Sequence, residues 1–117
     1  MANVIANACA RAAQLGSDIN EHIPTLRRYA AECSTVAEFG VRGITSTWAF
    51  LDGLVASPAE TKRLICVDID DIPRLGEVAA LAQSAGVFTF QHKDSVAADL
   101  DPGVDLLFID TCTFTAT

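Results

Sequence analysis

The chain has 117 residues, half of them hydrophobic, and carries a formal net charge of −7 at pH 7. This length is typical of a single domain with a modest core, and the composition excludes a disordered or low-complexity protein. The acidic balance disfavours long-range attraction to nucleic acid or to anionic membranes, so we expect neither as a partner.

The cysteines and the N-terminal segment indicate the compartment. Cys9, Cys33, Cys66 and Cys112 lie far apart in the sequence and form no C-x-x-C pair. Two disulfides are an alternative, but this spacing favours buried, reduced thiols. No stretch is long enough to span a bilayer, and no basic leader precedes the first apolar residues. We therefore expect a cytoplasmic protein.

The first 33 residues predict two helices. Apolar residues recur at a spacing near four in residues 2–14. The expected buried face of this helix consists of Val4, Ile5, Ala8 and Ala12. A second helix is expected to begin at Asn20 or Pro24 and to end at Glu32. Residues 1–33 should therefore pack as a helical segment on the rest of the domain.

From Thr35 onwards, expected strands alternate with expected helices. The strands are 36–39, 63–68, 87–91 and 104–109. The helices are 46–55, a segment that opens at Asp71 or Pro73 and closes at Gly86, and a short one near 95–100. The run 63–68 is apolar almost throughout, as in a strand buried on both faces of a parallel sheet. The sequence therefore predicts an α/β fold with a parallel sheet.

The stretch from Thr35 to Ser46 carries the first candidate binding feature. Its apolar run contains Glu38, passes through Gly40 and Gly43, and restarts as a helix whose first turn is 45–47. A strand, a tight loop and a helix N-terminus in this order hold nucleotide-like cofactors in α/β proteins. Gly-x-x-Gly is common by itself, so the rest of the chain has to supply the context.

A carboxylate ends or closely follows each expected strand. These acids are Glu38, Asp68, Asp94 and Asp110. Because the carboxyl ends of parallel strands share one edge of a sheet, the four side chains are expected to converge on one crevice. Such a crevice suits a ligand with several hydrogen-bond donors or a positive charge. The alternative is that each acid caps the following helix or keeps a loop soluble.

Four segments carry a resemblance to a known family: Glu38-Phe-Gly-Val-Arg-Gly43, Val67-Asp-Ile-Asp70, Lys93-Asp94 and Leu107-Phe-Ile-Asp110. They resemble the successive cofactor-binding motifs of class I S-adenosylmethionine-dependent methyltransferases. The resemblance covers roughly residues 17–112 and implies S-adenosylmethionine as the cofactor.

The resemblance implies that the first motif holds the methionine end of this cofactor. Its residues are Glu38 and the loop that follows, with Phe39, Gly40, Val41 and Gly43. In the family, this end of the cofactor lies against the loop backbone. The glycines are therefore expected to let the backbone approach the ligand closely.

The later motifs imply contacts with the nucleoside and with the reacting group. Asp68 would accept hydrogen bonds from the ribose hydroxyls, and Ile69 would pack on the adenine face. Asp94, with Ser95 beside it, would bind the adenine amino group. Asp110 would face the transferring methyl group or its acceptor.

The family implies a three-layer, Rossmann-like parallel sheet, here of about four strands with N-terminal helices. Residues 34–110 would form this cofactor-binding half-domain, and residues 111–117 an irregular tail. The family's sheet has seven strands, and this chain ends after the fourth, as if truncated. The half that completes the acceptor pocket is then missing, so enzymatic activity stays open. No catalytic residue and no metal ligand is assigned.

Two alternatives stay open at the level of sequence. A nicotinamide-dependent oxidoreductase fragment also combines a glycine loop with an acid after the second strand, although Gly-Val-Arg-Gly lacks the G-x-G-x-x-G register. The other alternative is a catalytically inert interaction protein. In the family's strand order, strand 104–109 would become a sheet edge, which predicts a homo-oligomer formed through that strand.

Overall fold

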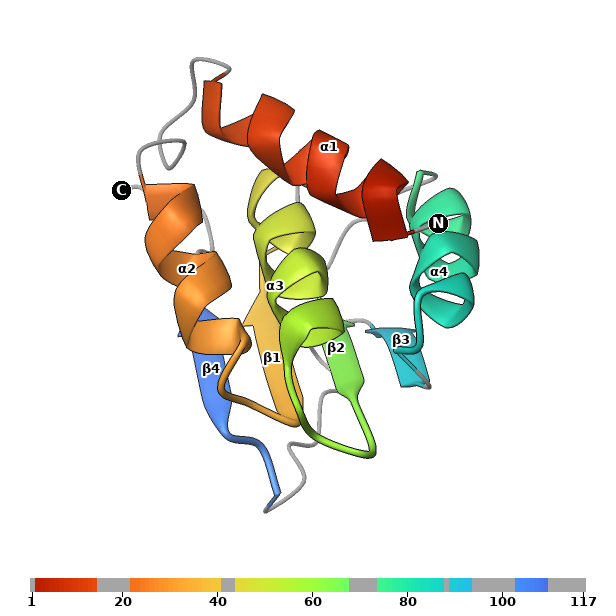
Figure 1. Cartoon of the computed structure of the whole chain (residues 1–117). Helices are drawn as coiled ribbons and strands as arrows, with labels where there is room; N and C mark the ends of the chain where they lie inside the picture. Colours follow the sequence, from red (N-terminus) through yellow and green to blue (C-terminus); the bar gives the residue numbers. More distant parts are fainter. Residues whose placement is uncertain are drawn as a thin grey trace, which may run out of the picture.

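The computed structural model describes residues 2–14, 22–40, 44–67, 74–87, 89–93 and 103–109 (Figure 1). The helices are α1 (Ala2–Gln14), α2 (Ile23–Ala30), α3 (Thr45–Ala56) and α4 (Leu75–Ser84). The strands are β1 (Thr35–Phe39), β2 (Arg63–Val67), β3 (Thr89–Lys93) and β4 (Leu106–Ile109). The helix expected near 95–100 and the tail 111–117 lie outside the described residues.

The described strands form one open, parallel sheet in the order β3-β2-β1-β4. The prediction of an α/β fold with a parallel sheet is therefore confirmed. One strand is displaced, because β3 covers 89–93 and not 87–91. The N–H of Val87 donates to the carbonyl of Ala82 at 2.9 Å, which holds Val87 in the turn that ends α4. Gly86 permits this turn with a φ of 94°.

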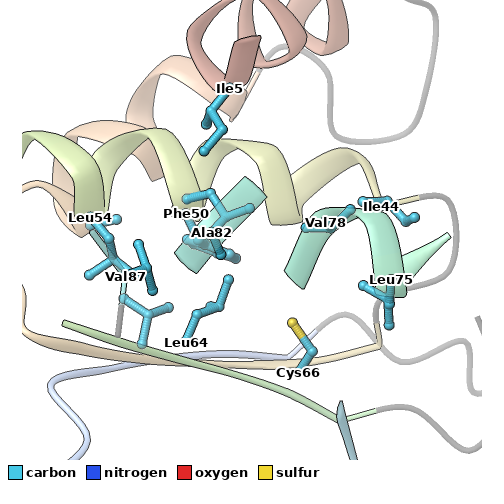
Figure 2. Packing of buried hydrophobic residues seen from close by; sticks show 13 residues of the cluster. Ile5, Ile44, Phe50, Leu54, Leu64, Cys66, Leu75, Val78, Ala82 and Val87 are labelled. Carbon is cyan, nitrogen blue, oxygen red and sulfur yellow. The ribbon is translucent and has the colours of Figure 1, made fainter. Parts of the chain in front are cut away.

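The described helices lie on one face of the sheet, with α3 along its middle and α1 crossing over α3 (Figure 1). The largest hydrophobic cluster fills the space between these helices and the sheet (Figure 2). In Figure 2, Phe50 and Leu54 of α3 point toward Leu64 of β2, and Ile5 approaches from α1. On the opposite face, Ala37, Ile65 and Val67 are also buried. The central strands are therefore covered on both sides.

The buried face of α1 differs from the expected one. Ile5, Cys9 and Ala12 are buried, whereas Val4 is 48% exposed. A spacing near four fits both sets of residues, so the pattern alone does not choose between them. The choice comes from packing, because Cys9 lies in a small cluster with Ile23 of α2 and Ala49 of α3.

Two expectations, that the thiols are reduced and that no segment spans a membrane, can be compared with the described residues. Cys9 and Cys66 are buried and Cys33 is half-buried, and all three are free thiols; Cys112 lies outside these residues. None of the helices in the described ranges has the length and apolar character that crossing a bilayer requires.

Helices α2 and α3 approach each other closely at Gly53. A Cβ atom placed on Gly53 would overlap the carbonyl oxygen of Arg27 and lie 2.6 Å from the Cβ of Ala30. Beside this contact, the Nε of Arg27 donates to Asp52 Oδ2 at 2.7 Å. The absence of a side chain at position 53 therefore sets the distance between the two helices.

We predict that Gly53→Ala destabilises the protein by about 1–3 kcal/mol, because α2 has to move away from α3. Urea unfolding measures this change. The control is Gly76→Ala in α4, where an added Cβ meets nothing within 4 Å. That variant should keep or raise the free energy of unfolding by up to about 1 kcal/mol. Equal effects of the two substitutions would contradict the close contact.

Asp105 fastens the start of β4 to the start of β1. Its Oδ2 accepts hydrogen bonds from the N–H of Ser34 (2.9 Å), the hydroxyl of Ser34 (2.8 Å) and the N–H of Thr35 (3.1 Å). These bonds, led by the one from the Ser34 backbone, lower the pKa of Asp105 below its ordinary value of 3.8. The ionised carboxylate therefore stabilises the attachment of β4.

We predict that Asp105→Asn lowers the free energy of unfolding by about 1 kcal/mol at pH 7. A carboxyl group with a lowered pKa in the folded state stabilises the protein above its unfolded pKa, and this stabilisation is lost as the pH falls through the folded pKa. The difference between the two proteins should therefore shrink as the pH falls from 5 toward 3. Urea titrations at several pH values, with Glu60→Gln as an exposed control, measure it. A difference that stays constant with pH would argue against this role.

Candidate functional site

The described strands end together at one edge of the sheet. Phe39 pairs with both Val67 and Ile109, and Val67 pairs with Lys93. These four residues are the last ones of their strands. The carboxyl ends of the strands therefore form one straight row, and the chain leaves each strand at the same level.

The strand order reverses at β1. From β1 the chain adds β2 and then β3 on one side, whereas β4 pairs with the other side of β1. In open α/β sheets, ligands bind outside the carboxyl ends of the strands at such a reversal. The candidate site is therefore the edge at the ends of β1 and β4, beside Gly40.

Glu38 is the residue before the last one of β1, and its side chain is fully buried. Because side chains alternate along a strand, Val36 and Glu38 face the helices and Phe39 faces the other side. The hydroxyl of Thr47 donates to Oε1 of Glu38 at 2.6 Å, and the hydroxyl of Ser46 donates to Oε2. Both donors belong to the first turn of α3. The carboxylate is thus held inside the protein.

Cys66 lies beside Glu38 on the neighbouring strand β2. The two residues are paired in the sheet, and the thiol lies 3.9 Å from Oε1 of Glu38. Burial, and next the negative charge of Glu38, raise the pKa of Cys66 well above 9.0. The thiol therefore stays protonated at neutral pH and donates to the carboxylate, which excludes it as a nucleophile.

Two left-handed residues flank the loop between β1 and α3. Gly40 has a φ of 88°, and its N–H donates to the carbonyl of Val67 at 2.8 Å. Ile44 precedes α3 with a φ of 67°, a rare conformation for a β-branched residue. Its side chain is buried in the main cluster (Figure 2). Core packing therefore holds the backbone of Ile44 in a conformation that it would otherwise avoid.

Three of the predicted cofactor-binding residues lie in the described ranges. Glu38 is buried under α3, Phe39 packs on the opposite face of the sheet, and Gly40 is at the strand end. The structure therefore brings Gly40 to the candidate edge and separates Glu38 and Phe39 onto opposite faces. The other predicted residues lie outside the described residues: Val41, Gly43, Asp68, Ile69, Asp94, Ser95 and Asp110.

Sequence reasoning missed the partners of Glu38. The sequence identifies Ser46 and Thr47 only as residues of a first helical turn, and Cys66 only as a buried thiol. A signal was present, because three hydroxyl residues open the helix that directly follows a strand with an internal acid. An acid in a fully buried strand requires donors, and the hydroxyls of the following helix are candidates for that role.

Among the residues that the structure describes, no set of three or more His, Cys, Asp or Glu side chains is arranged to hold a metal ion. The edge does offer the backbone of Gly40, which has no side chain to block a ligand. It also offers the first turn of α3, which is hydrogen-bonded to Glu38 of β1. This arrangement suits binding of a polar ligand.

Comparisons with protein-family models, with curated proteins and with solved structures found no match to this chain. A function therefore has to be argued from the residues of the chain and their geometry. The reversal of strand order at β1 and the level row of strand ends are the two structural facts that bear most directly on it.

Proposed function

We propose that the chain is an S-adenosylmethionine-dependent methyltransferase or the cofactor-binding portion of one. The observation that carries this proposal is the level row of strand ends. Val67, Lys93 and Ile109 belong to that row, and the next residue in the sequence after each of them is an aspartate. Consecutive Cα atoms are about 3.8 Å apart, and the proposal takes these three carboxylates to line this edge.

The chemistry of such an edge favours this cofactor over a dinucleotide. S-adenosylmethionine carries a sulfonium cation, an ammonium group, ribose hydroxyls and an adenine amino group. All of these are attracted to carboxylates or donate hydrogen bonds to them. A pyrophosphate would instead be repelled by several acids at the same edge. The nicotinamide alternative is weaker for this reason.

The proposal assigns the acids as the sequence motifs imply. Asp68 accepts from the ribose, Asp94 and Ser95 bind the adenine amino group, and Ile69 packs on the adenine. Asp110 follows β4 and lies nearest to the methyl group or its acceptor. The methionine end lies against the loop after Gly40, and the complete arrangement is a three-layer, Rossmann-like one.

Binding is the property to test first. Methyl transfer requires the sulfonium carbon and the acceptor atom to be held in line at near contact. None of the described residues is assigned as a general base, and the acceptor is not specified by any of them. Cofactor affinity, in contrast, can be measured without knowing the acceptor.

We predict that the chain binds S-adenosylhomocysteine, the product form of the cofactor, and that Asp68→Asn weakens this binding by about 1–3 kcal/mol. Isothermal titration calorimetry measures both. Glu60→Gln is the matched control, because it removes one negative charge from an exposed residue shortly before β2. NAD⁺ is titrated in parallel.

The outcomes separate the candidate functions. Binding of S-adenosylhomocysteine but not of NAD⁺, with loss in Asp68→Asn only, supports the proposal. Preferential binding of NAD⁺ favours the oxidoreductase alternative. If neither ligand binds, the methyltransferase proposal is wrong for this chain.

A second candidate function, self-association, is favoured by the exposure of β4. This strand is at the edge of the sheet that the described residues form, and Leu107 and Ile109 are 41% and 61% exposed. Edge strands with exposed apolar side chains pair readily with another chain. A catalytically inert protein that forms homo-oligomers through residues 104–109 would use this edge.

We predict for this second candidate that the protein is a dimer and that Ile109→Lys makes it monomeric, because a charge would be buried in the interface. Light scattering coupled to size-exclusion chromatography gives the mass. Val4→Lys, at an exposed apolar residue of α1, should leave the dimer intact. A monomeric wild-type protein would rule out self-association.

A further inference from the structure

Glu38 is enclosed by the protein and hydrogen-bonded to it. Its side chain is fully buried, and its two oxygens accept hydrogen bonds from Thr47 and Ser46. Because no part of the side chain is exposed, a ligand that contacted Glu38 directly would have to displace the residues that cover it, among them the first turn of α3. Displacing that turn would leave the buried hydroxyls without partners, and each unpaired buried group is penalised. Direct contact between Glu38 and a cofactor is therefore disfavoured.

The same bonds fix the beginning of α3. We use the name loop clamp for Glu38 together with Ile44, Ser46 and Thr47. Glu38 holds the first turn of the helix over β1, and the buried side chain of Ile44 holds the residue before that turn. At the other end of the loop, Gly40 is bonded to Val67. Both flanks of the loop are thus anchored to the sheet or the core.

We propose that Glu38 is a positioning residue that acts on the ligand site through Thr47 and Ser46. This role differs from the direct contact that the family resemblance implies. The identity of the ligand rests on the proposed function, whereas the anchoring of α3 can be measured without any ligand. Anchoring matters because a site that is ordered before binding loses less conformational entropy when the ligand arrives.

The place of Glu38 adds to this role, because acidic side chains near the N-terminal turn of a helix interact favourably with the helix dipole and its unpaired N–H groups. Each of these hydroxyl bonds joins the first turn of α3 to β1, so substituting Glu38 or substituting Thr47 should loosen the same turn. The clamp therefore predicts that substitutions of Glu38 and of Thr47 have the same consequences.

The first test is hydrogen exchange of the ligand-free protein. Glu38→Gln and Thr47→Val should each make the amides of residues 44–48 exchange roughly tenfold faster, with a smaller effect in α4. Thr47→Ser keeps the hydroxyl, so the amides of residues 44–48 should exchange as slowly as in the wild-type protein. Thr45→Val is the control, because Thr45 does not donate to Glu38. Unchanged exchange in 44–48, or an equal increase in α4, would overturn the inference.

The second test is calorimetry with S-adenosylhomocysteine. Glu38→Gln and Thr47→Val should weaken binding by similar factors, roughly tenfold, and the double variant should be no weaker than Glu38→Gln alone. If Glu38 contacts the ligand directly, Glu38→Gln weakens binding while Thr47→Val does not, and the positioning role is wrong. If Glu38→Gln fails to fold, Thr47→Val and Thr47→Ser carry the comparison.

The two tests distinguish a failure of the proposed function from a failure of the clamp. If the wild-type protein does not bind S-adenosylhomocysteine, the proposed function is wrong, and hydrogen exchange still decides whether the clamp exists. If the wild-type protein binds but the exchange of residues 44–48 does not respond to the substitutions, the clamp is wrong and the proposed function stands.

Discussion

The burial of a carboxylate under α3 is the constraint on which the rest of the structure depends. Burying an acidic side chain is unfavourable unless hydrogen-bond donors surround it, and Glu38 obtains them from Thr47 and Ser46. These bonds form only when the first turn of α3 lies directly over β1. The position of α3 along the sheet is therefore set by polar chemistry, in addition to hydrophobic burial.

The position of α3 in turn determines the packing of the other helices. The middle of α3 is buried almost all round, with Phe50, Leu51 and Leu54 fully enclosed. Gly53 allows α2 to approach, and the salt bridge from Arg27 to Asp52 closes the same interface. α1 then packs on both helices through Cys9, whose pKa is raised to about 11, chiefly by burial. The helical layer is thus assembled outward from one anchored helix.

Local patterns in the sequence predicted the elements, but not the contacts between them. The apolar run of β2 and the periodicity of α4 were enough to identify both, because they reflect burial of a whole segment. The hydrogen bonds of Asp105 to Ser34 join residues 71 positions apart, and no local pattern contains that information. The left-handed conformation of Ile44 was missed for a related reason: intrinsic preference opposes it, and only tertiary packing sustains it. At the candidate site, the glycine at position 40 was predictable, whereas the buried state of Glu38 required the structure.

The candidate edge is formed by two strands, and β1 is held in the sheet more firmly than β4. β1 is paired on both sides and covered on both faces, whereas β4 is paired on one side only among the described residues. β4 is held by its ladder to β1, by Asp105 at its start and by the edge-on contact of Phe108 with Phe50, whose ring centres are 5.4 Å apart. A ligand at the ends of β1 and β4 would contact both strands. Because any ligand that binds only the docked arrangement stabilises it, such a ligand would also strengthen the attachment of β4. Binding at the edge would therefore be thermodynamically linked to the integrity of the sheet.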